Sequence, residues 1–425
     1  MEKKRIKELG AVFRGMLTLL AGAGVAKLVA LVSIPVLTRL YSPADYGLIS
    51  LYVAVVTILG ACLTLRYSLA IPLPKTIGGC ANIFALSLGS MLVGLFLSAL
   101  VLTFVGDVLF DYLGLESLIP WKWVVLIGAF GVSISEILNM WLTRTRRYRL
   151  AAGAQILQAV SGESAKVIFG FLVLGGIGLI AGHLVTVLAG AVFILIKQLE
   201  ELLGGIKYIK LSRVVLLSKI YSGFPKFRLP SQLLLIFATQ APVLMVGRFF
   251  DVNVVGQLGL ALMALALPVS LLGDTMGRAF YGEISHIGKT QPKLISDLTR
   301  SVVLRLVLLA TPPALIIFFF SEEMFLVAFG GEWSLAGKLA SVLSISLVFQ
   351  FVQKPVSYIM FLYDGQKQLL YLNLQRAILV IASLWLGSSL YDDVVQVVLM
   401  YSVVLALHYI VSIYVAVRMI PVAVR

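Results

Sequence analysis

Long uncharged apolar runs recur along the whole chain and limit what it can fold into. A membrane-spanning helix needs about 20 mostly apolar residues. Runs of at least that order occur at 76–106, 167–196, 229–247, 252–273 and 394–417. Because hydrophobic residues make up 60% of the sequence and charged residues only 13%, a soluble domain could not bury them. We therefore predict an all-α polytopic membrane protein.

The charged residues assign the sides of the predicted helices, because lysine and arginine accumulate in cytoplasmic loops. Basic residues gather before residue 10, at 144–149 and at 197–228, whereas the loops near 107–116, 322–332 and 392–393 are acidic. Both termini are therefore expected in the cytoplasm. We predict twelve transmembrane helices, at 11–36, 46–70, 80–105, 121–142, 150–174, 178–196, 228–248, 252–276, 301–320, 336–362, 368–390 and 394–418.

One long apolar run needs a break to satisfy this topology. The run 167–196 could form a single helix, but the basic segments on both sides of 150–196 require an even number of crossings. Gly175, Gly176 and Gly178 offer a tight turn within it. We therefore predict two helices here, joined on the outer side.

Two short stretches indicate an internal repeat. Arg39 precedes Gly47 by eight positions in RLYSPADYG, and Arg248 precedes Gly256 by eight positions in RFFDVNVVG. Each stretch closes the outer end of one predicted helix and opens the next. The pattern predicts two six-helix bundles, 1–210 and 211–425, related as parallel repeats around a central cavity.

Longer stretches carry a resemblance to a known family: IPVLTRLYSPADYGLISLY, RYSLAIPLPK, and the segment from FPKFRLPSQ to DTMGRAFY. They resemble the polysaccharide-exporter branch of the multidrug/oligosaccharidyl-lipid/polysaccharide (MOP) superfamily, whose best-known members are the Wzx-type O-antigen flippases. The resemblance covers most of residues 11–285. One position departs from it, because the family often has an acid where this chain has Ser68.

The resemblance implies a flippase of the bacterial inner membrane that performs no covalent chemistry. Its substrate would be an undecaprenyl-diphosphate-linked oligosaccharide repeat unit, moved from the cytoplasmic to the periplasmic leaflet by alternating access. No cofactor is implied beyond a coupling proton or sodium ion. The implied partners are membrane lipid and the polysaccharide polymerase and assembly machinery.

Polar and cationic residues inside the predicted helices are the candidate site, because a diphosphate and sugars must cross a layer where charge is costly. The helices 336–362 and 368–390 are expected to be neighbours that place Lys354 and Arg376 at similar depth. Alternatively, their polar stripes join the helices by hydrogen bonds. The expected diphosphate-binding residues are Lys27, Arg66, Arg278, Lys354 and Arg376, and the expected polar lining is Gln155, Gln158, Gln350, Gln353 and Asn373.

Acidic residues at membrane depth are candidates for ion coupling. Glu163 and Lys166 stand at i, i+3, where a carboxylate and an ammonium pair on one helix. The pair is either structural, or Glu163 binds the coupling proton or sodium ion. Glu136 and Asp274 are further candidates. His183 is expected to serve packing, as is His408 in the last predicted helix.

Other classes of function lack their motifs in this sequence. No paired-carboxylate loop, Cys/His metal spacing, GxSxG or GxxxxGK[ST] motif is present, which argues against catalysis, a metal site and ATP hydrolysis. The net charge is +14, and the basic residues lie mainly in the predicted loops. This distribution predicts that the basic residues contact membrane lipid rather than nucleic acid. Two alternatives remain: a cation-coupled multidrug or small-molecule exporter of the same superfamily, and a membrane glycosyltransferase or polymerase. The cationic bias of the candidates favours an anionic substrate.

Overall fold

The described residues form helices joined by short turns, with no strand among them. The computed structural model describes the backbone of residues 2–421, and the side chains of residues 18–421 except those at positions 268, 271, 274 and 275. Ten helices within these residues are long and apolar enough to cross a membrane. In lipid, backbone amides and carbonyls must pair within the protein, which helices achieve within one segment. The prediction of an all-α polytopic membrane protein is confirmed.

Two predicted segments are helical without meeting the criteria for a span. Segment 150–174 corresponds to α6 (Tyr148–Phe171), whose glutamines, Glu163 and Lys166 lower its hydropathy. Segment 252–276 corresponds to α10 (Val252–Pro268), which continues through a π-turn at 269–273 into α11 (Asp274–Ile287). In the described part of the chain only ten helices satisfy both length and hydropathy, so the count of twelve stays a prediction.

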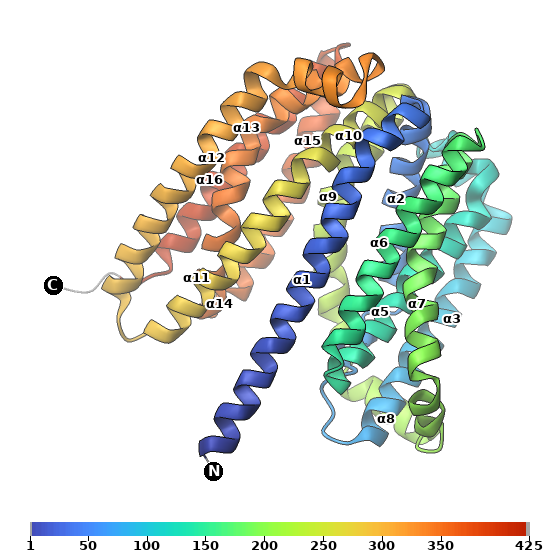
Figure 1. Cartoon of the computed structure of the whole chain (residues 1–425), viewed down its shortest axis with the longest axis vertical. Coiled ribbons are helices and arrows are strands. Elements are labelled where there is room, and N and C mark those ends of the chain that lie inside the picture. The colour runs from blue at the N-terminus through green and yellow to red at the C-terminus, as the bar shows by residue number, and fades with distance from the viewer. Residues whose placement is uncertain (1, 422–425) are drawn as a thin grey trace. The chain divides into compact units, whose positions relative to one another are not determined.

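The helices cluster into two compact units, Met1–Ile236 and Phe237–Arg425, which are described separately. In the first unit, α1 packs along α6, α6 along α7, and α5 against α2, α3 and α7 (Figure 1). Gly22 of α1 faces Ala152 of α6, and Leu40 faces Gly170, so the two helices run parallel. Besides α6, this unit contains α1 (Glu2–Leu40), α2 (Pro43–Leu63), α3 (Ile77–Phe104), α4 (Gly106–Tyr112), α5 (Lys122–Thr145), α7 (Gly176–Ile206) and α8 (Leu211–Ile220).

The long apolar run 167–196 is divided between two helices, as the charge pattern predicted. Helix α6 ends at Phe171 and α7 begins at Gly176. Gly175 between them has φ of 56°, a conformation that glycine adopts without strain. The prediction of two helices joined by a glycine turn is confirmed.

The basic segments of the first unit meet at one of its ends. Arg144 donates from Nε to Cys80 Sγ (3.0 Å) and from Nη2 to the Lys75 carbonyl (3.0 Å). Arg147 pairs with Glu201 at 2.6 Å. The start of α3, the α5–α6 turn and the end of α7 therefore lie together. This is the arrangement that the charge pattern predicts for one face of a membrane.

The second unit repeats this order of packing. Helix α10 packs on α13 as α2 packs on α5, and α12 lies on α13 as α3 lies on α5. Both α13 and α15 pack on α16, as α5 and α6 pack on α7. The remaining helices are α9 (Leu229–Phe249), which spans the unit boundary, α12 (Pro292–Phe329), α13 (Ser334–Val356), α14 (Tyr358–Leu362), α15 (Gln366–Leu390) and α16 (Val394–Arg418).

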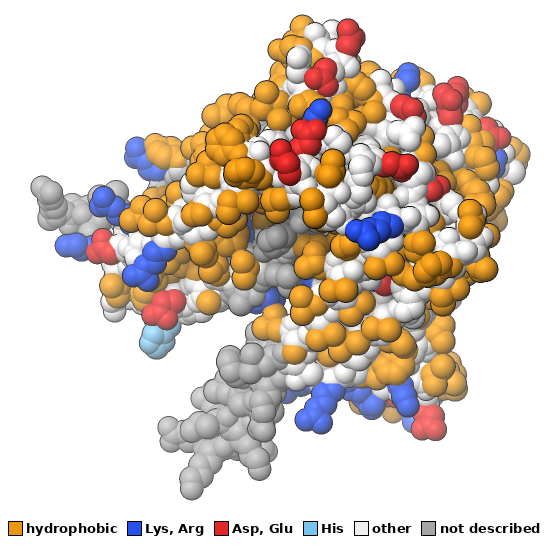
Figure 2. Space-filling model, turned by 45° about the horizontal axis from the view of Figure 1, so that its top comes forward, with side chains coloured by type: hydrophobic (Ala, Val, Ile, Leu, Met, Phe, Trp, Pro, Cys, Tyr) orange, Lys and Arg blue, Asp and Glu red, His pale blue; other side chains and the backbone are white. Residues whose placement is uncertain are grey.

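Hydrophobic side chains cover much of the face that Figure 2 shows. Large apolar residues such as Phe104, Val173 and Phe319 are exposed. A soluble monomer rarely exposes extended apolar surface. These side chains are placed to contact lipid.

Small residues let α6 and α7 approach closely, which predicts a strong effect of one added methyl group. A Cβ at Gly162 would lie 1.8 Å from Thr186 Oγ1 and 3.1 Å from Thr186 Cα, whereas a Cβ at Gly89 would meet nothing within 4 Å. We expect Gly162→Ala to destabilise the protein by about 1–3 kcal/mol through overpacking. Thermal unfolding in detergent, with Gly89→Ala as the control, measures this. Equal melting temperatures for the two variants would contradict it.

Candidate functional site

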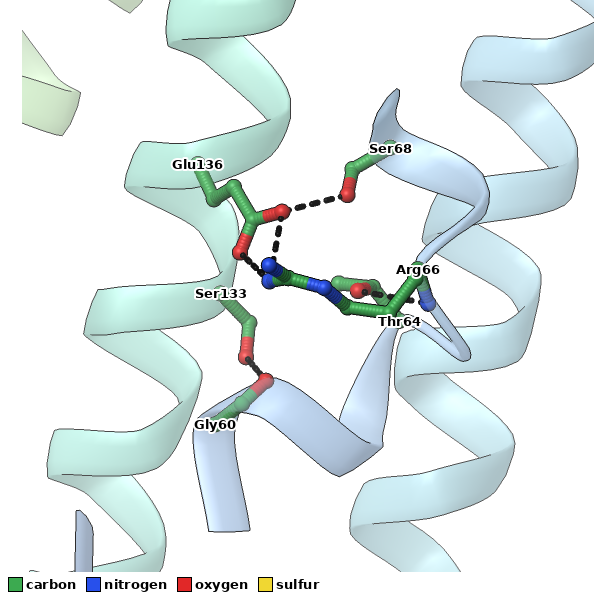
Figure 3. A network of polar contacts seen from close by, with 6 residues as sticks. All are labelled: Gly60, Thr64, Arg66, Ser68, Ser133 and Glu136. Atoms are coloured by element: carbon green, nitrogen blue, oxygen red, sulfur yellow. Dashed lines mark hydrogen bonds and ion pairs between the residues drawn. The ribbon is translucent and has the colours of Figure 1, made fainter. Parts of the chain in front are cut away.

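A charged network links the segment after α2 to α5 in the first unit (Figure 3). Arg66 Nη1 donates to both carboxylate oxygens of Glu136, at 3.1 and 2.9 Å. Ser68 Oγ donates to Glu136 Oε1 at 2.6 Å. The side chains of Arg66 and Glu136 are 12% and 21% exposed. The charge of Arg66, a predicted diphosphate ligand, is therefore compensated within the unit.

The turn after α2 directs Arg66 toward this network. Leu65 and Arg66 have φ of 48° and 61°, which is uncommon for residues other than glycine. The Arg66 backbone N–H donates to Thr64 Oγ1 at 3.3 Å. Next to it, Ser133 Oγ donates to the Gly60 carbonyl at 3.0 Å and joins α5 to α2 (Figure 3). The sequence pointed to Arg66 and Glu136 separately, and the structure brings them together.

The predicted pair on α6 forms inside the first unit. Glu163 Oε1 and Lys166 Nζ lie 2.7 Å apart. Glu163 is 8% exposed, and its Oε2 is buried without a hydrogen-bond partner among the described residues. The Tyr41 hydroxyl donates to the Lys166 backbone carbonyl at 2.6 Å. The carboxylate therefore keeps one free acceptor oxygen inside the protein.

His183 belongs to the surroundings of this pair, which sequence reasoning missed. It lies on α7 within electrostatic range of Lys166. Its ring packs edge-on against Tyr52 of α2, with centroids 5.5 Å apart. The nitrogen Nδ1 is buried and unpaired within the described part of the chain. A lone histidine in an apolar run offered no signal, because its partners come from α2 and α6.

Lys27 lies on α1, half-buried and without a carboxylate. It shares a helical face with the buried residues Ile34 and Thr38. The parallel register of α1 and α6 places it level with Gln155 and Gln158 of α6. Within the described side chains, Lys27 has no ion pair or hydrogen bond. Its charge is thus uncompensated in the unit.

The two glutamines of α6 differ in their surroundings. Gln158 packs over Gly190 of α7, where a Cβ would lie 2.1 Å from Gln158 Nε2. The Oε1 atom of Gln155 is buried and has no hydrogen-bond partner in the described structure. Gln155 therefore keeps a free hydrogen-bond acceptor at the level of Lys27, while Gln158 packs between α6 and α7.

The polar residues of α13 and α15 meet α16. Gln353 Nε2 of α13 donates to Ser412 Oγ at 3.1 Å. The guanidinium carbon of Arg376 on α15 lies 5.6 Å from the ring centre of Tyr409. Sequence spacing showed which residues share a helical face. It did not show that the polar residues of both α13 and α15 contact α16. Gln353 therefore joins α13 to α16, and not α13 to α15 as the alternative expected.

The other predicted residues of the second unit are distributed over several places. Lys354 Cδ lies over Gly273, 3.2 Å from where a Cβ would stand, so Lys354 and Arg376 contact different elements. Gln350 and Asn373 are half-buried, and Arg278 is exposed. The side chain of Asp274 lies outside the described residues.

The cations fall into two groups, those with a carboxylate partner and those without one. Arg66 and Lys166 have carboxylate partners, whereas Lys27 and Arg376 have none among the described side chains. Within the same residues, no three His, Cys, Asp or Glu side chains come close enough to hold a metal ion. An uncompensated cation at membrane depth can bind an anion, because Coulombic attraction is strong where water is scarce.

The comparisons with known proteins agree with the resemblance seen in the sequence. A family model described as polysaccharide biosynthesis protein matches residues 36–337. The resemblance to polysaccharide exporters is thereby confirmed. No curated protein sequence matches the chain significantly.

Solved transporters of the MOP superfamily have a similar fold. An inward-facing multidrug resistance MATE family transporter is 18% identical, with a TM-score of 0.70 and 94% of each chain covered. The lipid II flippase MurJ, in an inward closed conformation, is 14% identical, with a TM-score of 0.69 and 95% of this chain and 87% of that one covered. A MOP superfamily transporter from Pyrococcus furiosus is 16% identical, with a TM-score of 0.59 and 96% and 95% covered. At these identities the likeness concerns the fold.

The Arg66–Glu136 pair yields a test of stability. We expect Glu136→Gln to lower the free energy of unfolding by about 3 kcal/mol, because it leaves a largely buried guanidinium without its counter-charge. The double variant Arg66→Gln/Glu136→Gln should recover most of this loss. Ser68→Ala should cost about 1 kcal/mol, because it removes one hydrogen bond. Thermal unfolding of the wild type, Arg66→Gln, Glu136→Gln and the double variant measures the coupling between the two residues. Additive effects of Arg66→Gln and Glu136→Gln would contradict it.

Proposed function

The chain belongs to the polysaccharide biosynthesis protein family, and from this premise we propose that it is a flippase for lipid-linked oligosaccharides. It has the fold of MOP superfamily transporters. Its cargo is an undecaprenyl-diphosphate-linked oligosaccharide repeat unit, which it moves from the cytoplasmic to the periplasmic leaflet by alternating access. The name of one structural neighbour, a lipid II flippase, supports a lipid-linked cargo of this kind.

One observation carries the proposal: Lys27 is uncompensated on a membrane helix. A charge at the centre of a membrane helix costs about 2.5–3.5 kcal/mol on insertion-based scales. Other cations of the first unit, such as Arg66 and Lys166, have carboxylate partners. A diphosphate is the group that all lipid-linked cargoes of this class share, and the Lys27 ammonium attracts it without demanding a fixed geometry.

Glu163 couples transport to an ion gradient in this proposal. Its free oxygen Oε2 is buried, and Lys166 holds the other carboxylate oxygen. A proton or sodium ion binding at Oε2 changes the charge balance of the pair. Asp274 is a second proposed coupling residue, on α11.

The proposed location is the bacterial inner membrane, with both termini in the cytoplasm. The basic segments that meet at one end of the first unit support this orientation. Membrane lipid and the polysaccharide polymerase and assembly machinery are the proposed partners. Arg278, which is exposed, and Lys354 are proposed to contact the diphosphate along its path.

The alternatives predict different cargo or chemistry. A cation-coupled drug exporter binds cationic substrates, and the uncompensated charges of Lys27 and Arg376 disfavour them. A membrane glycosyltransferase or polymerase needs catalytic groups, and transporter folds are the structural neighbours. A transporter of an anionic lipid-linked cargo accounts for both observations.

Removing the Lys27 ammonium should abolish transport while the protein still folds. We expect Lys27→Ala to insert at least as well as the wild type, because it relieves a buried charge. It should fail to restore surface polysaccharide in a cell that lacks the gene, whereas Lys27→Arg should restore part of it. Leu28→Ala, which changes the exposed neighbour on the same helix, is the matched control. Full polysaccharide from Lys27→Ala at equal protein level would refute the cargo role.

Replacing Glu163 separates coupling from structure. Reconstituted vesicles with a fluorescent lipid-linked oligosaccharide and an imposed proton or sodium gradient provide the assay. We expect Glu163→Gln to lose the gradient dependence of transport, because a neutral amide cannot exchange the ion. The double variant Glu163→Gln/Lys166→Gln removes the charge imbalance and should recover stability without recovering that dependence. If it recovers both, the pair is structural.

A further inference from the structure

Arg376 is a cation in the middle of α15 with unused hydrogen-bonding capacity. Its guanidinium stacks near the ring of Tyr409 on α16, 5.6 Å from the ring centre. Its Nε atom is buried, and the described residues offer it neither a hydrogen-bond partner nor a carboxylate. The residue as a whole is partly exposed, so the outer nitrogens of the guanidinium remain accessible.

Two more buried polar atoms without partners lie beside it on α16. Tyr409 is 2% exposed and His408 is 4% exposed. The Tyr409 hydroxyl and His408 Nδ1 have no hydrogen-bond partner among the described residues. Both side chains are within electrostatic range of Arg376. Orphan polar atoms are rare in protein interiors and each one is costly. Two of them beside a cation that has an orphan nitrogen of its own call for a missing partner.

The protein itself supplies no anion from the neighbouring helices. Helices α13, α15 and α16 contain no aspartate or glutamate. By contrast, Arg66 and Lys166 in the first unit each have a carboxylate within 3 Å, at 2.9 and 2.7 Å. The helices packed around Arg376 in the second unit therefore leave its counter-charge to a ligand.

We propose that Arg376, His408 and Tyr409 form an anion site that binds a phosphate group carried by a lipid. A guanidinium presents planar donors that match phosphate oxygens. The tyrosine hydroxyl and an imidazole N–H add donors from the adjacent helix. The inference rests on the proposed function and adds two residues of α16 to the cargo path. The phosphate belongs either to a prenyl diphosphate or to a phospholipid headgroup.

Binding measured without transport tests the site. The full chain is reconstituted in phosphatidylcholine nanodiscs and titrated with farnesyl diphosphate in a calorimeter, with farnesol as the probe that lacks the diphosphate. We expect Arg376→Gln to weaken farnesyl diphosphate binding by about tenfold or more, as for loss of a charged hydrogen bond. Tyr409→Phe should weaken it about threefold or more, and Arg376→Lys should retain part of the affinity.

A second arginine–tyrosine pair provides the matched control. The guanidinium carbon of Arg418 lies 5.1 Å from the ring centre of Tyr414 at the end of the same helix. Tyr414 is 57% exposed, so this pair lacks the buried orphan atoms. We expect Arg418→Gln and Tyr414→Phe to bind farnesyl diphosphate like the wild type.

A second arm separates the two sources of phosphate. Nanodiscs with added phosphatidylglycerol report headgroup binding through the lipid retained in native mass spectra. Loss of farnesyl diphosphate affinity in Arg376→Gln assigns the site to a prenyl diphosphate, and loss of retained phosphatidylglycerol alone assigns it to a headgroup. Unchanged binding of both probes by Arg376→Gln, with Arg376→Lys and Tyr409→Phe also unchanged and all variants folded, overturns the site.

Binding and polysaccharide restoration, measured on the same variant, distinguish failure of this site from failure of the proposed function. Polysaccharide restored by Arg376→Gln despite lost binding would leave the anion site standing and remove it from the transport path. Lost polysaccharide with intact binding would leave the flippase proposal standing and overturn this site.

Discussion

The cost of charge in a hydrocarbon layer governs this structure. Each cation at membrane depth must find a carboxylate, reach the interface or bind a ligand. Arg66 and Lys166 take the first course through Glu136 and Glu163. Lys27 and Arg376 differ from these two cations, because the described side chains give them no carboxylate partner.

Much of the helical arrangement could be predicted from the sequence, because a small number of strong constraints fix a membrane segment. Its backbone must pair with itself, its length must match the bilayer, and its basic flanks must lie on one side. The charges required a break in the run 167–196, because a single helix there would have placed basic segments on opposite sides, and the glycines located the break before Gly176. The weak hydropathy of α6 shows the limit, since its polar residues, Glu163 among them, serve contacts inside the protein.

The site was less predictable because spacing along one helix does not identify the helix that faces it. Glu163 and Lys166 are one turn apart, and their pairing could be predicted. Arg66 and Glu136 are far apart in sequence, and only the left-handed turn after α2 brings them together. Arg376 was expected to accompany Lys354, yet it faces Tyr409 because α16 packs against both α13 and α15.

The π-turn between α10 and α11 has a consequence for how this chain tolerates insertions and deletions. A π-turn holds one residue more than an α-helical turn, so it rotates the following helix by about 100° relative to an uninterrupted one. That rotation directs Phe280 and Ile284 of α11 into the core that contains Val356 and Ile359. A relative one residue shorter within 269–273 would turn this apolar face away from α13 and α14. The number of residues in 269–273, rather than their identity, therefore decides which face of α11 packs against α13 and α14.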